Sequence, residues 1–163
     1  MLDKKLFQEL LSEAELSPRK RSHLNFHSRS DDPVQRLCIA LKSGTYVRPH
    51  YHPEKNKWEL TLVLKGEVGI LLFDYTGVVT KRMELSPDAS ICGVEIEPKT
   101  WHTTFPLSDE AVIMEIKEGP FIPIDPSNYA TWAPVEGGSD TQKFLEWAKE
   151  AVVGESYTPT VSF

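Results

Sequence analysis

The sequence lacks several features that would place it in a specialised class of protein. With two cysteines in 163 residues it is not a disulfide-stapled scaffold, and a chain of this length can fold without a disulfide or a metal. No apolar run approaches the roughly 18 residues that span a bilayer, and the N-terminus has no continuous signal-peptide core. Basic residues are outnumbered, 18 Lys and Arg against 24 Asp and Glu, unlike in nucleic-acid-binding proteins. We therefore expect one cytoplasmic domain with no nucleic-acid or membrane partner.

The two cysteines, Cys38 and Cys92, each lie within a β-like run. In a cytoplasmic protein such thiols are typically reduced residues of the core, and we expect this of both. A single disulfide or a metal-binding role is the alternative.

Repeated β-like segments occupy the middle of the chain and predict an all-β fold. Eight short runs of alternating or apolar residues are separated by turn residues, at 34–41, 45–52, two within 58–74, 78–85, 90–97, 100–107 and 111–118. This near-regular spacing is typical of an antiparallel sandwich or barrel, and not of a parallel sheet with crossover helices.

A short helix is expected on each side of this β region. Asp3 can cap the first helix, and Ser139 or Asp140 can cap the second. The basic cluster 19–21 is interpreted as a solvated connector, and the residues from Gly154 onward as a loose tail. The expected organisation is an N-terminal helix and connector over 1–33, a barrel over 34–121, and a C-terminal wrap, helix and tail over 122–163.

The segment 44–66 contains the residues that suggest chemistry. His50 and His52 are two positions apart, so in a strand their side chains point to the same face, and Glu59 begins the next predicted strand. His102 lies much later, in another predicted strand. An H-x-H pair alone is weak evidence. Three imidazoles and one carboxylate on inward rows, however, together predict a metal site.

The spacing of these residues resembles the first motif of the cupin superfamily. The motif is matched at every gap but one, as Gly44-x5-His50-x-His52-x6-Glu59-x6-Gly66. The departure is a two-residue insertion in the loop after His52, which leaves the register of the following strand intact. His102 falls on the histidine position of the second cupin motif, where Lys99 replaces the usual glycine.

Four segments are more specifically similar to the cupin-fold metalloproteins of the WbuC family, over roughly residues 17–150. They are SPRKRSHLNFH (17–27), DDPVQR (31–36), GTYVRPHYH (44–52) and YATWAP (129–134). The resemblance implies a cupin jelly roll that holds one divalent ion (Fe, Mn, Ni or Zn) through His50, His52, Glu59 and His102. It also implies a homodimer and a link to bacterial surface polysaccharide metabolism, but it supplies no reaction and no catalytic residue.

Three other residues are candidates for contacting a small-molecule ligand. Arg48 shares the row of His50 and could bind a carboxylate or phosphate, or pair with a structural carboxylate. Tyr46 could donate its hydroxyl to a ligand or belong to the core. If Arg36 faces the interior it needs an anionic partner, either Glu115 or a ligand.

Three functions remain open on this evidence. The first is a metal-dependent isomerase, epimerase or dioxygenase that acts on a sugar-like or acidic metabolite. The second is a metal-bearing module that senses a small ligand without turnover. The third is a metal-free sugar-nucleotide epimerase, which is disfavoured because no aspartate lies near His50 or His102 to complete its His–Asp base.

Overall fold

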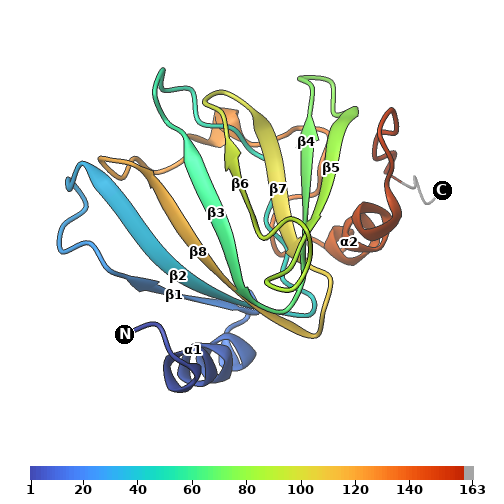
Figure 1. The fold of residues 1–163 in the computed structure, drawn as a ribbon. Helices are drawn as coiled ribbons and strands as arrows, with labels where there is room; N and C mark the ends of the chain where they lie inside the picture. The colour runs from blue at the N-terminus through green and yellow to red at the C-terminus, as the bar shows by residue number, and fades with distance from the viewer. Residues whose placement is uncertain (160–163) are drawn as a thin grey trace.

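The computed structural model describes residues 1–159, and its strands form two antiparallel sheets that face each other (Figure 1). The five-stranded sheet has the order β1-β2-β8-β3-β6, and the three-stranded sheet has the order β5-β4-β7. The strands are β1 Arg21–Asn25, β2 Val34–Lys42, β3 Glu59–Lys65, β4 Val68–Phe73, β5 Val79–Leu85, β6 Gly93–Ile96, β7 Trp101–Pro106 and β8 Glu110–Glu118. This is the all-β jelly roll that the sequence predicts.

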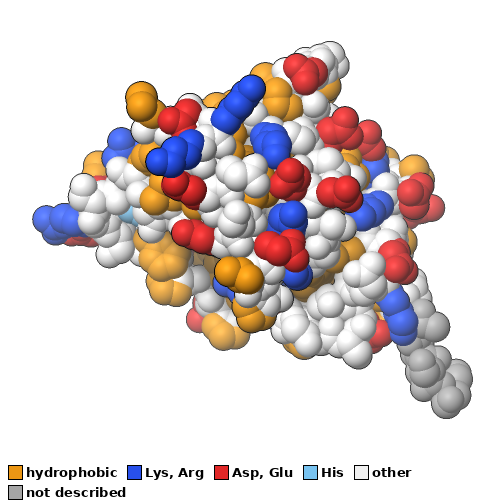
Figure 2. All heavy atoms as spheres, turned by 90° about the horizontal axis from the view of Figure 1, so that it is seen from below, with side chains coloured by type: hydrophobic (Ala, Val, Ile, Leu, Met, Phe, Trp, Pro, Cys, Tyr) orange, Lys and Arg blue, Asp and Glu red, His pale blue; other side chains and the backbone are white. Residues whose placement is uncertain are grey.

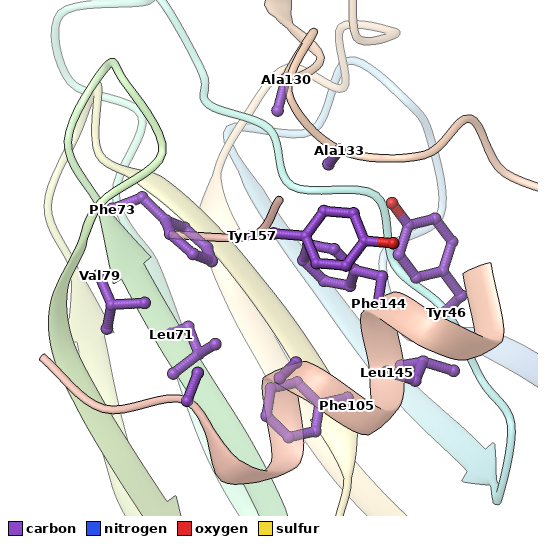
Figure 3. Close-up of a cluster of buried hydrophobic side chains, with 12 residues drawn as sticks. Tyr46, Leu71, Phe73, Val79, Phe105, Ala130, Ala133, Phe144, Leu145 and Tyr157 are labelled. Atoms are coloured by element: carbon purple, nitrogen blue, oxygen red, sulfur yellow. The ribbon is translucent and has the colours of Figure 1, made fainter. Parts of the chain in front are cut away.

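Each sheet is covered on its outer face by one of the two predicted helices. α1 (Lys4–Leu16) begins after Asp3, whose side chain accepts a hydrogen bond from the backbone N–H of Leu6 at 2.9 Å, and packs against β2 and β8. α2 (Thr141–Glu150) packs Phe144 against the outer face of the three-stranded sheet (Figure 3). A third apolar cluster fills the space between the sheets, so the layers run helix, sheet, sheet, helix.

The wrap between β8 and α2 contains one short 3-10 helix, Pro126–Asn128. No helix in the described part of the chain is long and apolar enough to cross a membrane. On the face seen in Figure 2, side chains of both charges are interspersed with apolar ones, so this face presents no continuous field of one sign.

Residues 45–52, predicted as a strand, form an irregular segment with one isolated β-bridge position. Pro49 and Pro53 lack the backbone N–H that a regular ladder requires. Only His50 pairs with β7, through hydrogen bonds between its backbone and that of His102 at 3.1 and 2.9 Å.

A strand forms where a solvated connector was expected. Arg21, in the basic cluster, begins β1 and is buried. Its guanidinium donates to the carbonyl oxygen of Tyr46 at 2.6 Å and pairs with Glu136 at 2.8 Å. These two partners allow the charge to be buried, so the cluster is part of the sheet and not only a surface connector.

Residues 154–157, where the predicted loose tail begins, pack against the sheet and α2. The backbone N–H of Val79 donates to Glu155 O at 2.7 Å, and that of Gly154 donates to Val79 O at 2.8 Å. Tyr157 packs on Phe144, with ring centroids 5.0 Å apart (Figure 3). Residues 160–163, the end of the predicted tail, lie outside the described residues.

The two cysteines differ in environment, which corrects the prediction that both belong to the core. Cys38 is buried, whereas Cys92 is exposed, and both thiols are free. Burial raises the pKa of Cys38 to about 11. We expect Ellman's reagent at pH 8 to modify one thiol per native chain rapidly and two after unfolding, because only an accessible thiolate reacts. Rapid reaction of two thiols in the native protein would contradict the burial of Cys38.

Candidate metal centre

The four predicted metal ligands lie between the two sheets. Glu59 begins β3 in the five-stranded sheet, and His102 is on β7 in the three-stranded sheet. His50 and His52 come from the irregular segment that the backbone pair with His102 holds beside β7. The Lys99 backbone N–H also donates to His52 O at 3.1 Å, which fixes the end of that segment. Residues distant in sequence are thereby brought together.

The side chains of this group converge. The ligand nitrogens of His50, His52 and His102 all lie within 4.8 Å of one another. The carboxylate of Glu59 places Oε1 3.2 Å from His52 Nε2 and Oε2 3.1 Å from His102 Nε2. All four residues are buried. Nitrogen and carboxylate lone pairs at such distances need a shared cation, either a proton or a metal ion.

Backbone carbonyls orient two of the imidazole rings. Nδ1 of His50 lies 2.9 Å from Arg48 O, and Nδ1 of His102 lies 2.8 Å from Thr100 O. With Nδ1–H donating to a carbonyl, the Nε2 lone pair of each ring faces the cluster, which is the arrangement that metal-binding histidines use.

His52 provides an independent test of whether the residues fit a metal ion. Its Nε2 is buried and has no hydrogen-bond partner among the described residues. The 3.2 Å approach to Glu59 Oε1 is within range, but its geometry is not that of a hydrogen bond. An unpartnered buried nitrogen costs about 1–3 kcal/mol. A metal ion ligated by this nitrogen would remove that cost, so the donor set fits a divalent ion.

The pKa values follow from burial and from the charges within the cluster. Burial, aided by His102, lowers the pKa of His50 to about 3, which keeps this imidazole neutral. Burial also acts to lower the pKa of His102, but the contact with Glu59 outweighs it and raises that pKa. Burial acts to raise the pKa of Glu59, yet Lys117 and the two imidazoles hold it well below its usual range. Glu59 is therefore ionised and favours a cation beside it.

Lys117 and Glu115 complete the charged cluster. Sequence reasoning named Glu115 only as a possible partner of Arg36 and did not identify Lys117. Lys117 Nζ donates to Glu59 Oε1 at 2.7 Å and to Glu115 Oε2 at 3.0 Å. In the run 111–118, the odd-numbered and the even-numbered residues lie on opposite faces of the strand, and both sets end in a charged residue. Alternation alone therefore does not show which set faces inward. The one signal was an opposite-charge pair two positions apart at the end of an apolar strand.

Arg48 and Tyr46, predicted to contact a ligand, both bond to the backbone of the C-terminal wrap. The Arg48 guanidinium donates to Ala130 O at 2.7 Å and lies over the Tyr129 ring. Tyr46 is buried beside α2 and donates its hydroxyl to Pro134 O at 2.6 Å (Figure 3). Neither side chain is among the described residues that line the two cavities near the histidines, which are presented below.

Arg36 does not face the interior. It shares its row with Cys38 and Ala40, which pack against α1 on the outer face of the sheet, and it is exposed. The interior anionic partner considered for Arg36 is therefore unnecessary, and Glu115 pairs with Lys117 instead.

One cavity borders the histidine cluster, and a second, larger cavity shares part of its lining. The smaller, of about 140 Å³, lies between the sheets and is lined in part by His50, Glu59 and His102. The larger, of about 590 Å³, is bounded by β1, β2, β8 and the segment 121–129. The residues that line both cavities, and so mark where they meet, are His23, Ile39, Glu115 and Lys117.

A comparison with known protein families gives a match to a family model. A family model described as "Domain of unknown function (DUF6016)" matches residues 2–85, just over half of the 163-residue chain. No curated protein matches the sequence.

Solved structures with a similar fold include three proteins of different description. The salicylate 1,2-dioxygenase of Pseudoaminobacter salicylatoxidans has a TM-score of 0.54 at 10% identity, covering 72% of this chain and 33% of that one. KdgF from Halomonas sp. has a TM-score of 0.50 at 16% identity, covering 66% and 84%. The DMSP lyase DddQ of Ruegeria pomeroyi has a TM-score of 0.50 at 16% identity, covering 64% and 49%. At these identities the likeness establishes the cupin jelly-roll fold and assigns no activity.

Proposed function

The chain belongs to the family described as "Domain of unknown function (DUF6016)", and we propose that it is a cupin that binds one divalent metal ion through His50, His52, Glu59 and His102. The observation that carries the proposal is the convergence of three imidazole nitrogens within 4.8 Å beside an ionised carboxylate. Three imidazoles and one carboxylate suit Fe(II), Mn(II), Ni(II) or Zn(II).

We infer that the site serves a small sugar-like or acidic metabolite. The larger cavity, of about 590 Å³, is within the usual size range of small-molecule sites. Its lining is rich in side chains that bind hydroxyl or acidic oxygens, namely Arg19, His23, Asn25, His27, Ser28, Arg29, Ser30 and Lys117. A bound divalent ion would supply Lewis-acid polarisation of a ligand oxygen.

The chain's own residues supply orientation and charge at this site. Lys117 lies where the two cavities meet, and its ammonium carries a third N–H beyond the two donated to Glu59 and Glu115. A ligand oxygen that reaches this point could accept that N–H. The apolar part of the same wall, around Leu37, Ile39 and Phe121, limits how much of the ligand can be charged.

The resemblance to WbuC-type proteins extends the proposal in two directions. On its basis we propose that the ligand belongs to bacterial surface polysaccharide metabolism and that the protein is a cytoplasmic homodimer. Light scattering at micromolar concentration tests the dimer, and a monomeric mass would contradict it.

Metal analysis tests the proposed function. Chelator-treated protein is dialysed against Fe(II), Mn(II), Ni(II) or Zn(II), and bound metal is measured by mass spectrometry. We expect one ion per chain for the native protein and for the control His27→Ala, whose ring bonds the backbone of Arg36 outside the cluster. We expect little or none for His52→Ala. Native protein that takes up no ion, or His52→Ala that takes up a full complement, would refute the proposal.

A panel of hydroxy acids and sugar acids then distinguishes catalysis from sensing. Consumption of a compound by the metal-loaded protein, and not by the chelator-treated protein, identifies an enzyme. Thermal stabilisation of the loaded protein by a compound that is not consumed identifies a binding module.

A further inference from the structure

Lys117 occupies an unusual environment for a lysine. Its side chain is only 19% exposed, and its ammonium contacts two carboxylates, those of Glu59 and Glu115. The register of the five-stranded sheet pairs Lys117 of β8 directly with Glu59 of β3, so the backbone itself sets this contact. Lysine is rarely buried unless it is paired, and here one of its partners is a proposed metal ligand.

The contact with Lys117 makes the two oxygens of Glu59 unequal. Oε1 accepts a charge-assisted hydrogen bond from Lys117 at 2.7 Å, whereas Oε2 faces His102 Nε2 at 3.1 Å. Bonds of this kind are about twice as strong as those between neutral groups. With Oε1 held by the ammonium, Oε2 is the oxygen of Glu59 that is available to an ion.

Glu115 sets the net charge of the group formed by Glu59, Lys117 and Glu115 itself. An ammonium beside a metal ligand would repel a divalent ion. Glu115 accepts a hydrogen bond from the same ammonium at 3.0 Å, so its charge offsets that of Lys117. The cluster of Glu59, Lys117 and Glu115 therefore keeps the net charge of a single carboxylate.

We propose that Lys117 is a positioning residue that restricts Glu59 to one oxygen for the metal ion, and that Glu115 is its charge partner. The inference rests on the metal site proposed above. Its consequence is an additional coordination position for an oxygen of water or of a ligand, because a carboxylate that gave both oxygens would occupy two positions.

The test uses Mn(II), which reports its bound water through the relaxation of water protons. Lys117→Met removes the charge and the donors while keeping a side chain of similar length. The matched control is Lys65→Met, since Lys65 of β3 pairs with Glu110 of β8 at 2.8 Å, in the same sheet but outside both cavities. We expect the native and Lys65→Met proteins to hold the same number of exchangeable waters per Mn(II). Lys117→Met should hold one fewer, because Oε1 is released to the ion.

Substitution of Glu115 tests the charge balance. Glu115→Gln should weaken Mn(II) binding about tenfold, since it leaves the ammonium of Lys117 less compensated. The double variant Glu115→Gln, Lys117→Met should recover to within about threefold of the native affinity and keep the lower water count. The double variant has uncharged side chains at both positions, so the water count can still be measured if Lys117→Met alone does not fold.

The outcomes separate this inference from the proposed function. Native protein that binds no Mn(II), Fe(II), Ni(II) or Zn(II) would refute the metal site itself. Native protein that binds one Mn(II), with the same water count in the native, Lys117→Met and double-variant proteins, would overturn only the positioning role. Unchanged affinity in Glu115→Gln would overturn the charge-partner role.

Discussion

A His102→Ala protein is expected to bind divalent metal at least about a hundredfold more weakly than the native chain, because it loses one of the three converging imidazoles. The backbone hydrogen bonds between residues 50 and 102 do not involve the side chain, so the segment that carries His50 and His52 should stay in place. The loss is then attributable to the imidazole. Metal content after dialysis, together with the circular dichroism spectrum, measures it.

His27→Ala is the matched control for this variant, since it removes an imidazole outside the cluster. It should retain one ion per chain. A His102→Ala protein with a native spectrum and undiminished metal content would show that His102 is a structural residue.

A Phe144→Ala protein is expected to lose about 3–5 kcal/mol of unfolding free energy, the usual cost of emptying a buried aromatic site. Phe144 is fully buried. Its ring contacts those of Tyr46, Trp147 and Tyr157, at centroid distances of 5.4, 5.3 and 5.0 Å. Urea unfolding measures the change.

Val152→Ala is the control for the helix substitution. Val152 follows the end of α2 and is 54% exposed. Its substitution should change the unfolding free energy by less than about 0.5 kcal/mol. Similar losses in the two variants would contradict the packing of α2 described above.

The convergence of the four proposed metal ligands could be predicted because the spacing of the motif reflects the register of the strands. Glu59 and His102 lie on regular strands, and their positions follow from alternation and from the cupin spacing. His50 and His52 reach the same site for a different reason from the one predicted. Their segment is not a strand, and the backbone bridge between His50 and His102 places it. That bridge spans 52 positions of sequence and has no local signal.

The features that sequence reasoning missed depend on tertiary contacts. β1 is short and polar at every position except Leu24, and only its pairing with β2 and the buried partners of Arg21 make it a strand. Tyr157 is one aromatic residue in a polar stretch, so nothing nearby predicts that it packs on Phe144. The inward row of β8, which brings Lys117 beside Glu59, is defined by the register with β3.

The central claim is that one divalent ion binds among His50, His52, Glu59 and His102, and anomalous diffraction tests it most directly. Crystals of the Mn(II)-loaded protein would be measured near the manganese absorption edge. The account predicts one anomalous peak per chain within about 2.0–2.3 Å of the histidine Nε2 atoms and of one oxygen of Glu59. No peak, or a peak at other side chains with this cluster left without metal, would contradict it.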